Sequence, residues 1–109
     1  MNTETGIERL HFEFVGANKI LPFEAMLVGV VGSGNLEVLI ESSAKTPFIV
    51  SIETSAHGFK PIWEAVLRDF HSRHALSGVH ISINDMGATP AVVSLRLEQA
   101  LAEVRKGTA

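Results

Sequence analysis

The chain has 109 residues and no cysteine. This absence excludes disulfide bridges, thiolate zinc sites and thiol nucleophiles, and it is consistent with a reducing compartment. Any covalent chemistry on the chain must therefore use hydroxyl, amine, imidazole or carboxylate groups.

Basic segments and long apolar runs are also lacking. No stretch is rich in lysine and arginine, and the formal net charge is −3. Because nucleic-acid-binding domains normally carry a basic patch or stripe, we expect no nucleic-acid partner.

The longest apolar run, from Ala25 to Val31, is far shorter than the roughly 20 residues of a membrane helix. The N-terminal residues lack the basic start and apolar run of a secretory signal. We therefore expect a soluble, cytoplasmic chain with no membrane partner.

The composition is typical of a globular protein, with 46% hydrophobic and 19% charged residues. No internal repeat, low-complexity segment or linker divides the sequence. A chain of this length is one domain's worth of residues and can bury a core of its own. We expect a single domain over residues 1–109.

Apolar and polar residues alternate in several short segments, which is typical of strands with one buried face. In residues 8–14 the apolar side chains Leu10, Phe12 and Phe14 fall on one side. The segment 25–31 is apolar enough to be a largely buried strand. The predicted strands cover residues 8–14, 25–31, 35–41, 47–54 and 79–83.

Two other segments have the apolar spacing of a helix with one buried face. The first covers residues 59–70, where Pro61 suits the first turn because its missing N–H needs no partner there. Its expected buried face consists of Ile62, Trp63, Val66, Leu67 and Phe70.

The second helix is expected to begin at Thr89 and Pro90, which suit the N-cap and the first helical position. Residues 92–97 also alternate, so a strand there is the competing prediction. The cap and the continuation rich in Ala, Glu and Leu favour the helix. Its expected buried stripe consists of Val93, Leu97, Ala100, Leu101 and Val104.

The predicted order is strand-strand-strand-strand-helix-strand-helix. Consecutive strands followed by helices indicate a mostly antiparallel sheet with the helices packed on one face. The expected fold class is therefore α+β, with a sheet of about five strands and two helices.

The first candidate site is Gly32-Ser33-Gly34, between the predicted strands 25–31 and 35–41. Glycine supplies the positive φ angles of tight turns, so these strands are expected to form a hairpin. The flanking glycines would leave the Ser33 hydroxyl open to a bulky partner and let the backbone approach phosphate oxygens. A plain hairpin turn explains the same residues, and spacing alone favours it. The Gly-x-Ser-x-Gly pattern of hydrolases and the P-loop pattern are both absent.

The second candidate is His71 and His74, which are spaced so that one helix face could present both imidazoles to a metal. Asp69 is the one nearby carboxylate at ligand spacing, and the polar residues Ser72 and Arg73 lie between the histidines. A solvated helix end, where cations complement the helix dipole, is the favoured interpretation.

The third candidate is the predicted turn Asn84-Asp85-Met86-Gly87. Carboxylate and amide side chains are common in turns because they bond to nearby backbone groups. The alternative is that Asn84 or Asp85 lies near the Ser33 loop and helps a modifying enzyme or partner to recognise it. The residues alone leave both interpretations open.

Two blocks of the sequence resemble malonate decarboxylase acyl carrier subunits. Residues 28–39, Val-Gly-Val-Val-Gly-Ser-Gly-Asn-Leu-Glu-Val-Leu, resemble their prosthetic-group segment. Residues 85–90, Asp-Met-Gly-Ala-Thr-Pro, and 92–99 resemble their C-terminal segment. The related citrate lyase acyl carrier subunit has a glutamate where Gly32 stands here and no Thr-Pro after its Gly-Ala, so both details favour the malonate family.

The resemblance implies a carrier with no catalytic residues of its own. Ser33 would hold 2′-(5″-phosphoribosyl)-3′-dephospho-CoA through a phosphodiester, and the terminal thiol of this phosphopantetheine-type group would carry acetyl or malonyl. The implied partners are the acyl-transferase subunit and the decarboxylase subunits of the complex, and the enzyme that attaches the prosthetic group. No metal is implied.

Two alternatives remain beside the malonate carrier. One is the acyl carrier subunit of a citrate or citramalate lyase, which shares the prosthetic group. The other is an interaction domain of the same fold without acylation. An independent enzyme is disfavoured, because no second titratable residue is spaced to act as a base for Ser33.

Overall fold

A computed structural model describes residues 6–20, 22–29 and 36–108 of the chain. Within these ranges the elements, in chain order, are β1 (Glu8–Phe14), β2 (Asn18–Lys19), β3 (Met26–Val28), β4 (Leu36–Ser42), β5 (Phe48–Thr54), α1 (Lys60–His74), β6 (Leu76–Ser77), β7 (Val79–Asp85) and α2 (Pro90–Thr108).

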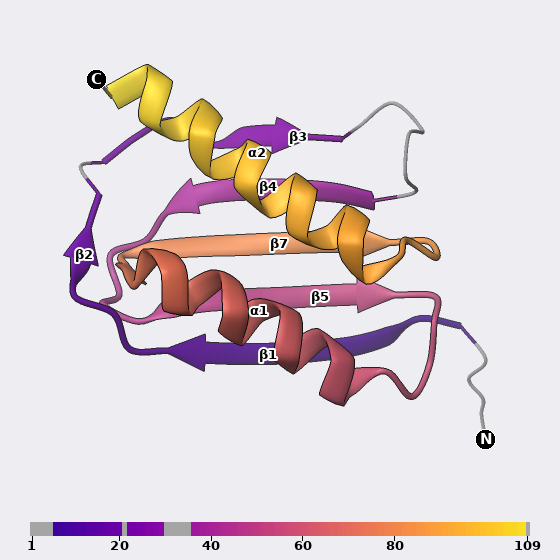
Figure 1. Cartoon of the computed structure of the whole chain (residues 1–109). Helices are drawn as coiled ribbons and strands as arrows, with labels where there is room; N and C mark the ends of the chain where they lie inside the picture. The colour runs from indigo at the N-terminus through magenta and orange to yellow at the C-terminus, as the bar shows by residue number, and fades with distance from the viewer. Residues whose placement is uncertain (1–5, 21, 30–35, 109) are drawn as a thin grey trace.

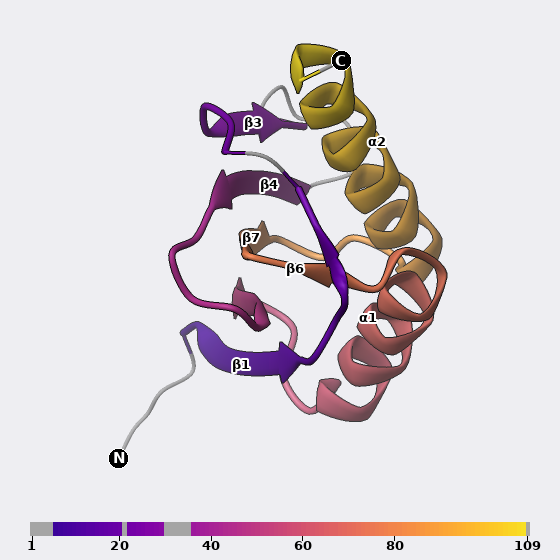
Figure 2. The same cartoon turned by 90° about the vertical axis from the view of Figure 1, so that its left-hand side faces the viewer.

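The main sheet has the strand order β1-β5-β7-β4-β3. Neighbouring strands are antiparallel except β5 and β7, which run parallel. Parallel strands cannot be joined by a tight turn, and α1 provides the crossover between them. Both helices lie on one face of the sheet, as the front view and the side view show (Figures 1 and 2). The predicted α+β class, the mostly antiparallel sheet and the placement of the helices are confirmed.

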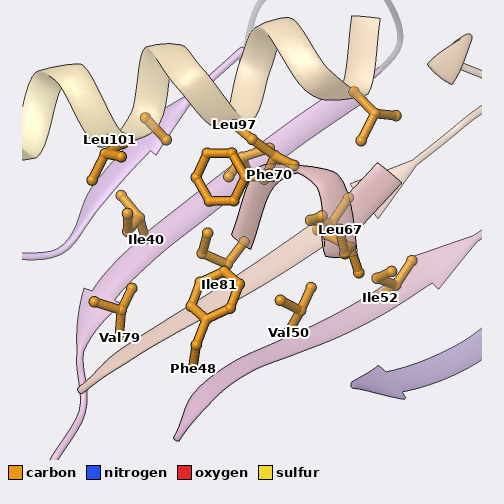
Figure 3. Close-up of a cluster of buried hydrophobic side chains, with 14 of the residues drawn as sticks. Ile40, Phe48, Val50, Ile52, Leu67, Phe70, Val79, Ile81, Leu97 and Leu101 are labelled. Carbon is orange, nitrogen blue, oxygen red and sulfur yellow. The ribbon is translucent and has the colours of Figure 1, made fainter. Parts of the chain in front are cut away.

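The core lies between the helices and the sheet. Side chains from α1 and α2 point toward the inner face of the central strands (Figure 3). Burying each such side chain contributes about 1.5–3 kcal/mol relative to leaving it exposed, so this layer holds both helices in place. The fully buried residues labelled in the figure are Ile40, Phe48, Val50, Ile52, Leu67, Phe70, Val79, Ile81, Leu97 and Leu101, none more than 1% exposed.

Most predicted strands are confirmed within one or two residues, but the burial expected for residues 25–31 is wrong. The strand there, β3, covers only Met26–Val28 and lies at the edge of the sheet, where Leu27 is 49% exposed. An edge strand has one neighbour and is not covered on every side, which an apolar run alone does not reveal. Residues 30 and 31 lie outside the described residues.

The helices match their predictions with two differences. The first extends to His74 rather than ending at Phe70, and its residue Ile62 is 45% exposed instead of buried. The second is a helix throughout 92–97, and all the residues of its predicted stripe are buried. Thr89 is confirmed as its cap, because its Oγ1 accepts a hydrogen bond from the Val92 N–H at 3.3 Å.

A small second sheet was not predicted. The two-residue strands β2 and β6 pair in parallel, which places Asn18 beside the end of α1. The Asn18 N–H donates to the Ala75 carbonyl at 2.8 Å, and its side-chain amide donates to the His74 carbonyl at 2.8 Å. Ala75 itself has a left-handed φ of 49° and terminates α1. These bonds satisfy helix-end carbonyls that would otherwise lack a partner.

Candidate functional site

One end of the main sheet brings together the candidate segments. Leu36, the first residue of β4, pairs with Asp85, the last residue of β7, and Asp85 also pairs with Thr54, the last residue of β5. Both helices follow connections that leave this end, at the right-hand side of Figure 1. We call the end marked by Leu36, Thr54 and Asp85 the Asp85 end of the sheet.

Asp85 is a buried carboxylate whose two side-chain oxygens both accept hydrogen bonds. It is 2% exposed. Thr54 Oγ1 donates to Oδ2 at 2.7 Å, and the N–H groups of Gly87 and Ala88 donate to Oδ1 at 3.2 and 2.8 Å. Asp85 therefore ties the end of β5 to the connection between β7 and α2. The prediction that this carboxylate bonds to nearby backbone groups is confirmed.

Asn84 and Asp85 end the strand β7 instead of forming the turn predicted at 84–87. Successive side chains of a strand point to opposite faces, so Asn84 lies on the face away from the helices. There its amide donates to Glu37 Oε1 on β4 at 3.0 Å. Only Asp85 faces the layer that contains the helices.

Gly29, directly after β3, is held closely between β4 and α2. It has a φ of +83°, and a Cβ there would collide with the Leu36 carbonyl oxygen and lie 2.8 Å from Arg96 Nε. Arg96, on α2, also donates to Gln99 Oε1 at 2.8 Å. A guanidinium is therefore packed against the base of the chain segment that leads to Gly32-Ser33-Gly34.

The predicted site residues Gly32, Ser33 and Gly34 lie outside the described residues. The strands on either side are antiparallel neighbours, with Val28 opposite Val38, so the predicted pairing of these strands is confirmed, and the predicted turn lies outside the described residues. Ser33 precedes Leu36, the first residue of β4 at the Asp85 end, by three positions. The role of Ser33 stays a prediction.

An apolar pocket opens between the first turns of α1 and α2 at the same end of the sheet. Its volume is about 280 Å³. Phe59 and Ile62 lie at its margin and are 46% and 45% exposed, whereas Trp63 is 6% exposed, which confirms the prediction that Trp63 belongs to the core. The complete lining is Ala56, Phe59, Ile62, Trp63, Val66, Asp85, Gly87, Ala88, Pro90 and Val93. Sequence reasoning missed this pocket, because its walls come from segments far apart in the chain.

The expected solvated helix end at His71 and His74 is wrong. His71 is 8% exposed, its ring stacks against both Phe14 and Phe48 at centroid distances of 5.2 and 5.1 Å, and its Nε2 lies 3.1 Å from the Leu76 carbonyl oxygen. The long-range packing of β1 and β5 on α1 covers the ring. The structural role of His71 is therefore to stack against aromatic rings in the core.

His74 is also partly covered, and its partner is a carboxylate that sequence reasoning did not associate with it. His74 Nε2 lies 2.9 Å from Glu98 Oε1 on α2, and Arg73 also bonds to Glu98. Burial raises the pKa of the Glu98 carboxyl, but the hydrogen bonds from His74 and Arg73 outweigh burial and hold the pKa below its usual range. The hydrogen bond to Glu98 and a second one to Asp69 raise the pKa of Arg73. This cluster joins the two helices.

Two searches over the described ranges were negative. No group of three or more His, Cys, Asp and Glu side chains in those ranges could hold a metal ion. No helix there is both long and apolar enough to cross a membrane.

Comparisons with known proteins all indicate the same family. Residues 24–104 match the family model for the malonate decarboxylase delta subunit (MdcD). The malonate decarboxylase acyl carrier protein of Burkholderia cepacia is 67% identical over 100 residues, which are 92% of this chain and 93% of that protein. The protein of the same name from Stenotrophomonas maltophilia strain K279a is 50% identical and covers 93% of this chain and 97% of its own length.

A solved structure agrees with the sequence comparisons. One chain in the crystal structure of a Pseudomonas malonate decarboxylase hetero-tetramer in complex with malonate superposes with a TM-score of 0.78 at 38% identity. The match covers 89% of this chain and 98% of that one. By fold and by sequence, this chain belongs to the family of malonate decarboxylase acyl carrier proteins.

Proposed function

We propose that the chain carries acyl groups for malonate decarboxylation on a prosthetic arm attached to Ser33, and that the arm is 2′-(5″-phosphoribosyl)-3′-dephospho-CoA. The observation that carries this proposal is the family match over residues 24–104, which includes Gly32-Ser33-Gly34. When bound, the arm supplies a terminal thiol that holds acetyl or malonyl as a thioester. The chain itself performs no bond-making step on the acyl group.

The basic groups at the Asp85 end suit an arm that contains several phosphates, and the carboxylates Glu37 and Glu53 lie on the opposite face of the sheet. Arg96 packs against Gly29 on the segment leading to Ser33. Neither helix has an acidic residue in its first turn, and Lys60 opens α1. Helix N-termini carry partial positive charge, so an anionic group tethered at this end meets favourable electrostatics. The donors present therefore fit the proposed group.

Tethering is the contribution of this chain to the reaction. Ser33 Oγ would hold the arm through a phosphodiester, on a connection between the edge strand β3 and β4. A tethered thioester reaches the active sites of its complex at an effective concentration far above that of a free one. Within the described residues, β3 itself pairs with no further strand on its outer side.

The proposed partners are the acyl-transferase subunit, which exchanges acetyl for malonyl, and the decarboxylase subunits, which release CO₂. An attaching enzyme must first load Ser33. We place this cycle in the cytoplasm. The hetero-tetrameric state of the Pseudomonas malonate decarboxylase supports an assembly of this kind.

The test is intact-mass measurement and peptide mapping of the chain purified from its native host during growth on malonate. An added mass equal to the arm, located on Ser33, is the expected result. Ser33→Ala should abolish both the added mass and malonate turnover in the reconstituted complex. Ser55→Ala is the matched control, because Ser55 is an exposed serine next to Thr54 at the same end of the sheet. Unmodified Ser33 in a host that consumes malonate would instead favour an interaction domain without acylation.

A further inference from the structure

The pocket between the two helices has the size of a site for one part of a larger ligand. Pockets that hold whole drug-sized molecules measure roughly 300–1,000 Å³. This pocket, at about 280 Å³, lies just below that range. It is therefore too small for a complete CoA-like arm and large enough for one compact group.

The walls of the pocket suit an uncharged group with apolar faces. Its one carboxylate, Asp85, is buried, and its oxygens already accept hydrogen bonds from Thr54, Gly87 and Ala88. A charged ligand would lose water here without meeting a partner of opposite charge, which is costly. The acyl end of the arm must stay accessible for reaction, and a malonyl end carries a carboxylate that such walls disfavour.

Two aromatic side chains line the pocket, one at its margin and one in its wall. Phe59 is 46% exposed at the start of α1, and Trp63 lies one turn later. Nucleobases stack on aromatic rings, and each such stack favours the bound state substantially. A planar base is therefore the chemical class that this lining suits best.

We propose that this pocket holds the adenine base of the arm on Ser33, with the base stacked on Phe59 and beside Trp63. The inference rests on the proposed function, because it takes the arm as given. Ser33 is three residues from Leu36, and a chain of that length spans at most about 11 Å. Leu36 pairs directly with Asp85, which lines the pocket.

The order of groups along the arm agrees with this placement. The phosphoribosyl unit and the adenosine are the parts nearest to Ser33, and the pantetheine with its thiol is the distal part. Anchoring the base would hold the part of the arm nearest to Ser33 in place and leave the thioester free to move. An arm that is already held at its base loses less conformational entropy when an active site binds its thioester end.

The experiment uses isotope-labelled full-length chain to which the attaching enzyme has transferred an unlabelled arm. Intact mass first establishes that the arm is on Ser33, and isotope-filtered NOE spectra then report which protein protons lie beside the adenine H2 and H8. We expect NOEs to Phe59 and Trp63. Trp63 is the single Trp of a chain without Tyr, so its fluorescence should also change on loading.

Two variants separate stacking from general surface effects. Phe59→Ala should reduce the ratio of stacked to free base by about 5- to 150-fold, because it removes one aromatic stack. Leu95→Ala is the matched control, because Leu95 is 53% exposed on α2 and does not line the pocket. The control should leave the NOEs and the Trp63 fluorescence unchanged.

The outcomes distinguish this inference from the proposed function. An arm on Ser33 whose base shows no NOE to pocket residues would overturn the inference and leave the carrier function intact. A chain without any arm would overturn both. Loss of complex assembly in Phe59→Ala, with no NOE from the base in the wild type, would assign the pocket to a partner subunit instead.

Discussion

Thr54 donates a hydrogen bond to Asp85 across the ends of two parallel strands, from Oγ1 to Oδ2 at 2.7 Å. Both side chains are buried, at 0% and 2% exposure. Because Asp85 also binds the N–H groups of Gly87 and Ala88, this pair fixes where β5 ends and how the chain enters α2. The geometry of the pocket and of the first turn of α2 therefore depends on it.

Thr54→Val should destabilise the chain by about 1–3 kcal/mol, because it leaves a buried carboxylate oxygen without its donor while keeping the side-chain shape. The measurement is the free energy of unfolding in urea. Asn84→Ala, at the exposed neighbour of Asp85, is the control and should change it by no more than about 0.5 kcal/mol. Equal effects of the two substitutions would show that the bond contributes nothing specific.

Gly29→Ala should lower the free energy of unfolding more than an ordinary substitution of glycine by alanine. A Cβ at this position would collide with the Leu36 carbonyl oxygen, and the φ of +83° is strained for alanine. Gly58→Ala is the matched control, because its φ is +84° but no atom lies within 4 Å of the added Cβ. Thermal unfolding should show a loss for Gly29→Ala that exceeds the control by at least about 1 kcal/mol. Similar losses would mean that the close approach to β4 is not maintained.

The Glu98 cluster should make stability depend on pH in the acid range. The pKa of Glu98 is lower in the folded chain than its ordinary value, so its contribution is fully present above the unfolded pKa of about 4.3. It is lost as the pH falls through the lowered folded pKa. Glu98→Gln should therefore flatten the fall in stability below about pH 4.3.

The size of this effect is limited by solvent, because the Glu98 side chain is 36% exposed. Glu98→Gln should therefore lower the free energy of unfolding at neutral pH by about 0.2–1 kcal/mol. Urea unfolding at a series of pH values measures it, with Glu103→Gln as the control at an exposed carboxylate farther along α2. A wild-type-like acid profile in Glu98→Gln would contradict the proposed linkage.

The periodic elements were predictable because their signals are local. Leu10, Phe12 and Phe14 alternate within one segment, and Thr89 caps the helix that follows it directly. These patterns depend on residues within a few positions of one another. The fold class followed from their order, since consecutive strands with helices after them allow few layered arrangements.

Exposure at the edges of elements was not predictable in the same way. Leu27 and Ile62 belong to apolar patterns, yet both are about half exposed. Periodicity shows which face of an element is apolar, but the neighbours that cover this face are chosen by the tertiary arrangement. Among the described strands of the sheet, β3 pairs with β4 alone, and α2 packs on the face that carries Met26 and Val28, so Leu27 on the opposite face stays exposed.

The sequence by itself determined the fold class, the family and the one glycine-flanked serine proposed to carry the arm, because each of these depends on local pattern or on motif. The tertiary structure decided that His71 lies in an aromatic stack, that Glu98 meets His74, and that Asp85 closes one wall of an apolar pocket. These contacts join segments separated by many residues. Their free energy depends on how the sheet and helices pack together, and no local pattern encodes that packing.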